Sequence, residues 1–94
     1  MNVYVLEIES GKDSVYVSRR LVTRILSIIN MTGTSKIKVG EDFMELLRSN
    51  WNFLEEKDEK SDLIGYLGNN PVYLSPEISG FLKIGEKDLK IIFE

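Results

Sequence analysis

The chain of 94 residues is 43% hydrophobic, 10% aromatic and 29% charged. This length and composition are typical of one ordinary globular domain, so we expect residues 1–94 to fold as a single domain. Fifteen acidic and twelve basic residues leave a net charge of −3. So small an acidic excess argues against broad binding to a phosphate backbone and indicates no particular partner.

The sequence contains no cysteine and no histidine. Their absence excludes disulfides, thiolate metal sites, the usual zinc sites, and Ser-His or Cys-His catalysis. Carboxylate, lysine or tyrosine chemistry remains, but it needs a specific constellation that the sequence does not offer. We therefore expect no catalytic residue, no cofactor and no metal site, in a protein that is not an enzyme.

The N-terminal segment, residues 1–10, has neither the basic start nor the long apolar stretch of a secretory signal. No stretch approaches the ~18 apolar residues that a membrane-spanning helix requires. We therefore expect a cytoplasmic protein without membrane contact.

The first predicted elements are two strands. Alternating β-branched and aromatic residues predict a strand over residues 2–8, and a turn follows at residues 9–13. Residues 14–17 have the composition of a second, short strand, so the two strands are expected to form a hairpin.

A helix is the strongest local pattern in the chain. Ser18 is suited to cap it, apolar residues recur at helical spacing as far as Ile29, and Gly33 ends it. Residues 35–39 then alternate as a strand, so a helix leads directly into a strand.

A second helix is predicted after Gly40. Glu41 and Asp42 favour the dipole at its start, and the apolar stripe that follows includes Trp51 and Leu54. This stripe should face the sheet, with Trp51 in the core. Residues 55–62 hold five acids, two lysines and no apolar residue, which predicts a solvated, mobile loop.

The C-terminal part predicts four strands. Residues 63–67 and 71–75, separated by a turn at residues 68–70, form the clearest hairpin signal. Two more short strands are expected over residues 81–84 and 89–93. The resulting prediction is an α+β fold: a mixed, mainly antiparallel sheet with two helices packed on it.

Pro71 and Pro76 fall at the two ends of the second hairpin strand. Proline cannot donate to a ladder of hydrogen bonds, so these residues argue for edge or strand-end positions.

Two kinds of binding motif are incomplete. The glycine-containing stretches at residues 11–12 and 33–36 lack the spacing of a phosphate-binding loop and are interpreted as ordinary turns. The acids at residues 58–62 lack the alternating ligands and the glycine of a calcium loop, and the neighbouring lysines oppose a cation.

Three arginines, Arg19, Arg20 and Arg24, form a small basic patch on the first predicted helix, with Arg20 and Arg24 one turn apart on the same face. The patch is compatible with a solvated helix face, a salt-bridging interface or nucleic-acid binding. Nucleic acid is the least favoured partner, because no aromatic platform lies nearby and the whole chain is acidic.

Candidate interface residues come from the hairpin, the terminal strands and the basic patch. The hairpin tyrosines favour the surface because the hairpin alternates apolar and aromatic sides. The short strands at residues 81–84 and 89–93 are expected to leave an apolar edge open to strand addition. The candidate residues, for a protein partner or for self-association, are Tyr66, Tyr73, Ile91, Phe93, Arg20 and Arg24.

From residue 18 onward, the order of features is similar to part of one protein family. The segments that carry the similarity are SKIKVG (35–40), FMELL (43–47), IGYLGNNPVYLSP (64–76) and LKIG (82–85). They resemble the C-terminal, axial-domain part of tailed-phage major capsid proteins of the HK97-type fold, where a helix feeds a strand, a helix and then a β-hairpin. A shell-forming subunit of that family also has a long N-terminal arm, an extended loop and a peripheral domain, which this chain is too short to hold. The resemblance implies an axial-domain-like fragment or a reduced relative.

These observations lead to the hypothesis of a non-enzymatic viral or prophage structural or assembly protein that acts through protein–protein contacts, in the host cytoplasm or in the virion. A small inhibitory or regulatory protein that binds a host enzyme or defence complex is the alternative. Small, acidic, cysteine-free domains suit that role equally well. A nucleic-acid-binding module that uses the three arginines is a third hypothesis.

Overall fold

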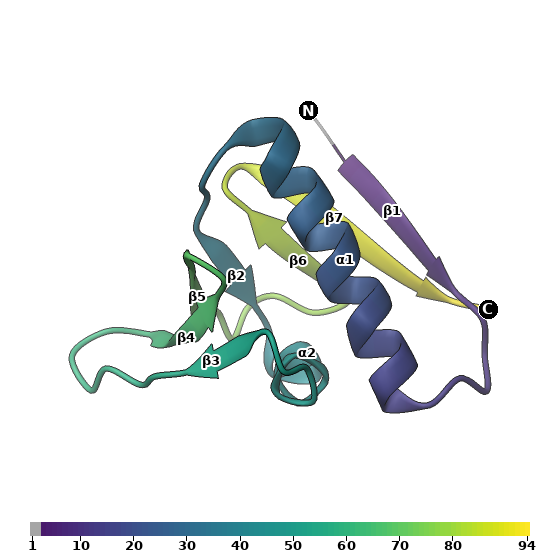
Figure 1. Cartoon of the computed structure of the whole chain (residues 1–94), viewed down its shortest axis with the longest axis horizontal. Helices are drawn as coiled ribbons and strands as arrows, with labels where there is room; N and C mark the ends of the chain where they lie inside the picture. The colour runs from purple at the N-terminus through teal and green to yellow at the C-terminus, as the bar shows by residue number, and fades with distance from the viewer. Residues whose placement is uncertain (1–2) are drawn as a thin grey trace.

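The computed structural model describes residues 3–94 as one seven-stranded sheet with two helices packed against it (Figure 1). Both helices lie on the same face of the sheet, so the architecture has two layers. Residue 2, with which the first expected strand begins, lies outside the described residues. In chain order the elements are β1 (Val3–Ile8), α1 (Ser14–Thr32), β2 (Ile37–Val39), α2 (Glu41–Arg48), β3 (Phe53–Glu55), β4 (Leu63–Leu67), β5 (Asn70–Leu74), β6 (Phe81–Ile84) and β7 (Lys87–Phe93).

The strands are ordered β1-β7-β6-β2-β5-β4-β3 across the sheet. β1 runs parallel to β7 and β2 runs parallel to β5, whereas the other four neighbouring pairs are antiparallel. The expected α+β fold with two packed helices is confirmed, but the sheet is mixed rather than mainly antiparallel. Parallel neighbours need long crossover connections, and α1 and α2 lie within the segments that separate these pairs along the chain.

The strand expected over residues 14–17, and with it the N-terminal hairpin, is wrong because this segment is the first turn of α1. Asp13 caps the helix, and its Oδ1 accepts a hydrogen bond from the backbone N–H of Tyr16 at 2.8 Å. Ser18, the expected cap, is buried inside the helix and donates its hydroxyl to the backbone O of Val15 at 3.0 Å. A good cap and a buried apolar stripe together outweigh the strand preference of valine and tyrosine.

α2 ends at Arg48, so the helix that was expected to reach Leu54 is shorter than predicted. Asn50 turns the chain there, with its Oδ1 accepting the backbone N–H of Asn52 at 2.9 Å. The next residues form β3 at one edge of the sheet. Trp51 lies in the turn and is 83% exposed, so its expected place in the core is also wrong.

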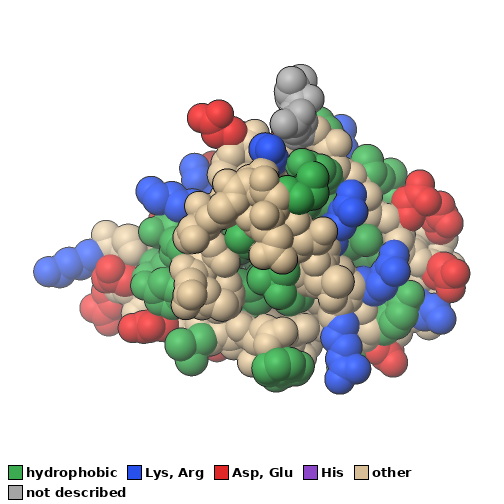
Figure 2. Space-filling view, turned by 45° about the horizontal axis from the view of Figure 1, so that its top comes forward, with side chains coloured by type: hydrophobic (Ala, Val, Ile, Leu, Met, Phe, Trp, Pro, Cys, Tyr) green, Lys and Arg blue, Asp and Glu red, His purple; other side chains and the backbone are tan. Residues whose placement is uncertain are grey.

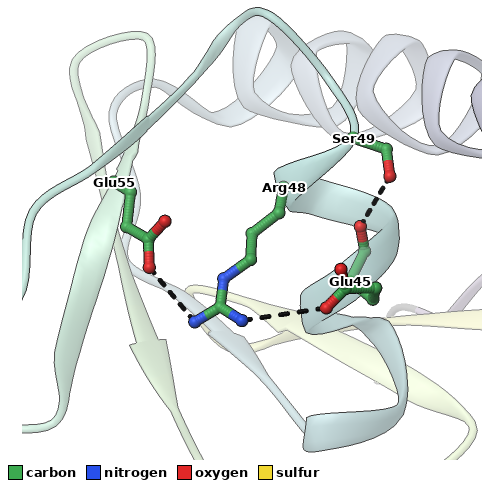
Figure 3. A network of polar contacts seen from close by, with 4 residues as sticks. All are labelled: Glu45, Arg48, Ser49 and Glu55. Atoms are coloured by element: carbon green, nitrogen blue, oxygen red, sulfur yellow. Dashed lines mark hydrogen bonds and ion pairs between the residues drawn. The ribbon is translucent and has the colours of Figure 1, made fainter.

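One ion pair links α2 to β3, and a second lies within α2. Arg48 lies between two carboxylates: its Nη2 is 3.1 Å from Glu55 Oε1, and its Nη1 is 3.7 Å from Glu45 Oε2 (Figure 3). The hydroxyl of Ser49 donates to the backbone O of Glu45 at 2.9 Å and satisfies a carbonyl of the last helical turn. The short edge strand is therefore anchored to the helix layer by its own side chain.

The hairpin expected over residues 63–75 is confirmed as β4 and β5, with Gly68 in the turn at a φ of 64°. Pro71 is the second residue of β5 and precedes the part that pairs with β2, residues 72–74. Pro76 follows the end of β5. Both prolines therefore lie at strand ends, where they remove no N–H that β2 needs.

The two terminal strands are present as β6 and β7, but they lie inside the sheet. β7 is flanked by β1 and β6, and β6 is flanked by β7 and β2. The expectation that these strands leave an open apolar edge is wrong. The outer edge of β7 is covered because β1 pairs with it. This long-range pairing is not revealed by local patterns.

Neither helix within residues 3–94 is long and apolar enough to cross a membrane.

The hydrophobic core lies between the helices and one face of the sheet. Fully buried core side chains include Leu21 and Ile25 of α1, Leu47 of α2, and Ile8, Ile37, Leu67, Val72, Leu82 and Leu89 of the sheet. Side chains that alternate with the core positions form what we call the helix-free face, which carries Val3, Val5, Lys38, Leu54, Tyr66, Tyr73, Phe81, Lys83, Asp88 and Lys90.

Candidate protein-binding groove

β1 is an edge strand, with β7 on one side and no strand of residues 3–94 on the other. The backbone O of Ile8 accepts the N–H of Glu94, just beyond β7, at 2.8 Å. Backbone groups of successive strand residues point to opposite edges, so those of Val3, Val5 and Glu7 point away from β7. β1 therefore presents a row of N–H and C=O groups that a further strand can use.

α1 packs over the sheet next to β1 (Figure 1). A groove of about 780 Å³ is lined by residues of both elements. Figure 2 shows several basic side chains beside apolar ones on the half of the molecule that carries α1 and β1, with acidic side chains toward its margin. The groove is lined by Tyr16, Arg19, Arg20, Thr23, Arg24 and Ser27 from the helix and by Val5, Leu6 and Glu7 from the strand.

The three arginines of the groove lack carboxylate partners. In the part of the chain that the structure describes, ion pairs involve Lys12 and Arg48, and none involves Arg19, Arg20 or Arg24. Arg24 is held by an aromatic contact instead, with its Cζ 5.6 Å from the centre of the Tyr4 ring. Its Nε is buried and has no hydrogen-bond partner among residues 3–94.

Together these features suit the recognition of an extended peptide. Added strands are held by main-chain hydrogen bonds, while side-chain pockets beside the edge provide selectivity. Guanidinium groups bind carboxylates strongly because they offer several N–H donors in a fixed, planar arrangement. The groove therefore fits an extended segment that carries acidic side chains.

The candidate residues from the sequence fall in several places. Arg20 and Arg24 line the groove together. Phe93 is 54% exposed at the end of β7, whereas Ile91 is 8% exposed and packs in the core, so Ile91 contributes no surface. The two tyrosines, Tyr66 and Tyr73, are half-buried on the helix-free face, far from the groove in the strand order.

Several residues of interest were not singled out from the sequence. Val5 and Glu7 became important only through the edge position of β1, which is a long-range property. Tyr16 was assigned to a strand, although Asp13 three residues earlier was a usable helix-cap signal. Leu54 was assigned to the helix stripe, and the Asn50 and Asn52 turn residues were the available signal against that assignment.

Acidic side chains do not form an alternative site. Residues 3–94 contain no group of three or more acidic side chains placed to hold a metal ion. No protein-family model, curated protein or solved structure matches this chain. The open edge of β1 and the arginine groove are thus the features from which a function can be inferred.

Proposed function

We propose that the protein is a non-enzymatic assembly protein that acts through protein–protein contacts and binds an extended protein segment at the open edge of β1. The observation that carries this proposal is the outward row of backbone groups at Val3, Val5 and Glu7, beside a groove with three arginines that lack carboxylate partners. Exposed strand edges are usually short, bulged or covered. β1 has 6 residues and pairs with β7 in continuous register, so its other edge is long enough to bind a partner.

A viral or prophage assembly is the proposed setting. The resemblance to the axial part of phage capsid proteins rests on the order helix, strand, helix, hairpin. The elements from α1 through β2 and α2 to the β4–β5 hairpin follow this order, with β3 placed before the hairpin. This order supports the proposal.

Backbone pairing at the edge is tested with Val5→Pro. The substitution removes an N–H that points away from β7, so it costs no bond inside the sheet, and proline is tolerated at such edge positions. The probe is a fluorescein-labelled peptide of alternating glutamate and valine, matching the 6 residues of β1. Fluorescence anisotropy should show that the wild type binds the peptide, that Val5→Pro loses binding, and that Val5→Thr, which keeps the N–H, restores most of it.

The role of the groove is tested with Arg20→Ala and Arg24→Ala. A hydrogen bond to a charged group contributes about 1.5–3 kcal/mol, so each substitution should weaken peptide binding about tenfold or more. Lys36→Ala and Lys38→Ala, one just before and one on the central strand β2, remove the same charge elsewhere and should leave binding unchanged. Absence of peptide binding by the monomeric protein, or binding that is indifferent to Val5→Pro in a protein of unchanged circular dichroism, would refute the proposal.

A further inference from the structure

The two edge strands of the sheet, β1 and β3, run in the same direction. Along the strand order, β1 and β7 are parallel, two antiparallel steps lead to β2, β5 is parallel to β2, and two antiparallel steps lead to β3. β3 therefore runs in the same direction as β1. If a second copy is placed beside the first in the same orientation, β3 of one copy lies parallel to β1 of the next, with both helix layers on the same side.

The β3 edge also offers backbone groups. The backbone N–H of Glu56, just after β3, donates to the backbone O of Ile64 in β4 at 3.1 Å. Because the backbone groups of successive strand residues point to opposite edges, those of Glu55 point away from β4, toward the free edge. Both ends of the sheet thus present outward N–H and C=O groups, on β1 at one end and on β3 at the other.

The two edges carry opposite charges. Arg19, Arg20 and Arg24 lie beside β1. β3 ends at Glu55, so the loop expected over residues 55–62 begins one residue later than predicted. Residues 55–62 hold five acids and two lysines and are exposed throughout. In Figure 1 the loop that contains this acidic segment extends from one end of the long axis, and β1 lies toward the other. The acidic segment of one copy therefore matches the arginine groove of another.

Apolar side chains are exposed at both edges. Trp51 and Leu54, beside and on β3, are 83% and 63% exposed. Val3 and Val5 of β1 are also exposed. In a shared sheet, Leu54 would lie on the same helix-free face as these valines, because all three alternate with core positions. Lateral contact between these side chains would remove part of this apolar surface from water.

We propose that copies of this chain associate head to tail, with β3 and the acidic segment of one copy bound to the β1 edge and the arginine groove of the next. This rests on the proposed function and identifies the partner as a second copy. Like edges are a poor match: two β1 edges would bring the arginines together, and two β3 edges would bring the acidic segments together. Contacts between unlike surfaces generate rings where the rotation closes and open fibres where it does not.

Charge reversal tests this arrangement directly. The groove variant is Arg20→Glu/Arg24→Glu, and the loop variant is Glu56→Lys/Glu59→Lys, both at positions outside the core. Light scattering over a concentration series should show that the wild type associates, more weakly at high salt because exposed charges are screened. Each variant alone should remain monomeric, and an equimolar mixture should associate again, because each groove then meets a loop of opposite charge. Lys36→Glu/Lys38→Glu changes the net charge as the groove variant does and should associate like the wild type.

The outcomes separate this inference from the proposed function. Restored association in the mixture supports both. A wild type that stays monomeric at every concentration but binds the glutamate–valine peptide overturns head-to-tail association. The groove would then bind a segment of a different protein, as expected if this chain is an inhibitory protein. A monomer that does not bind the peptide overturns both. Association that persists in the groove variant overturns the arginine groove as the contact surface.

Discussion

Lys38 and Lys83 lie directly opposite each other on the antiparallel strands β2 and β6, with both side chains on the helix-free face. Like charges in such a cross-strand pair destabilise a sheet by roughly 0.2–1 kcal/mol. Lys38→Glu should therefore raise the free energy of unfolding by about 0.5 kcal/mol, measured by urea denaturation at low salt.

The gain should shrink as salt is added, because the interaction is exposed to solvent and screened. Lys38→Gln, which removes the repulsion without adding an attraction, should give a smaller gain. A loss of stability for Lys38→Glu at low salt would contradict this account of the pair.

Asn70 connects the hairpin turn to the segment before β2. Its Oδ1 accepts the backbone N–H of Ser35 at 3.1 Å, and its Nδ2 donates to the backbone O of Leu67 at 3.2 Å. The residue is buried, so Asn70→Ala leaves groups unsatisfied and should lower the free energy of unfolding by about 1–3 kcal/mol. Chemical denaturation measures this change.

Asn70→Asp is a sharper comparison, because it keeps the acceptor but replaces the donor with a negative charge facing the Leu67 carbonyl. It should also be less stable than the wild type at neutral pH. An Asn70→Asp protein as stable as the wild type would show that the hydrogen bond to Leu67 contributes nothing.

Gly40 allows the loop between β5 and β6 to pack against the start of α2. A methyl group at this position would collide with the backbone O of Ile78, which cannot swing aside as a side chain can. The same loop is held by Asp42, whose Oδ2 accepts the N–H of Gly80 at 2.9 Å. Gly40→Ala should lower the free energy of unfolding by about 1–3 kcal/mol, measured by thermal or urea denaturation.

Ser79→Ala, at an exposed position of that loop, is the matched control and should change stability little. If Gly40→Ala were as stable as Ser79→Ala, the close contact between this loop and α2 would not exist in solution.

Trp51 provides an optical test of where the chain associates. It is the single tryptophan and is 83% exposed, so in the monomer its emission should be that of a solvated indole and acrylamide should quench it readily. Because it lies beside β3, head-to-tail association should shift the emission to shorter wavelength and reduce quenching. The measurement is fluorescence as a function of protein concentration.

The groove variant Arg20→Glu/Arg24→Glu should show no such concentration dependence. A strong shift to longer wavelength when the monomer unfolds in urea would contradict the exposed position of Trp51, because a residue already in water has little to gain from unfolding.

The elements that were predicted correctly share a strong local signal. The β4–β5 hairpin combines an apolar pattern with Gly68 in its turn, and glycines likewise separate β6 from its neighbours. Where the local signal was ambiguous, tertiary contacts decided the outcome. Val15 and Tyr16 favour a strand in isolation, but the capped helix that contains them buries a continuous apolar stripe against the sheet.

The groove was predictable only in part. Arg20 and Arg24 were recognised as neighbours on one helix face because helical spacing is a local property. The open edge beside them depends on β1 pairing with β7, the two most distant strands along the chain. Periodicity says which face of a strand is buried but not which strands are adjacent, so the edge position of β1 could not be derived from it. The burial of Ile91 was within its reach, because Ile91 shares a face with buried Leu89 and alternates with exposed Lys90.

The pairing of β1 with β7 also bears on the order of events during synthesis. β1 is translated first, yet its strand partner is the last strand of the fold, so β1 remains without its place in the sheet while every other element is made. Contacts between such distant segments form slowly because the intervening chain must be ordered first. During that interval Leu6 and Ile8, which end in the core, are exposed to solvent and to other molecules near the growing chain. The strand proposed to bind a partner in the mature protein is thus also the one that a nascent chain leaves unprotected for longest.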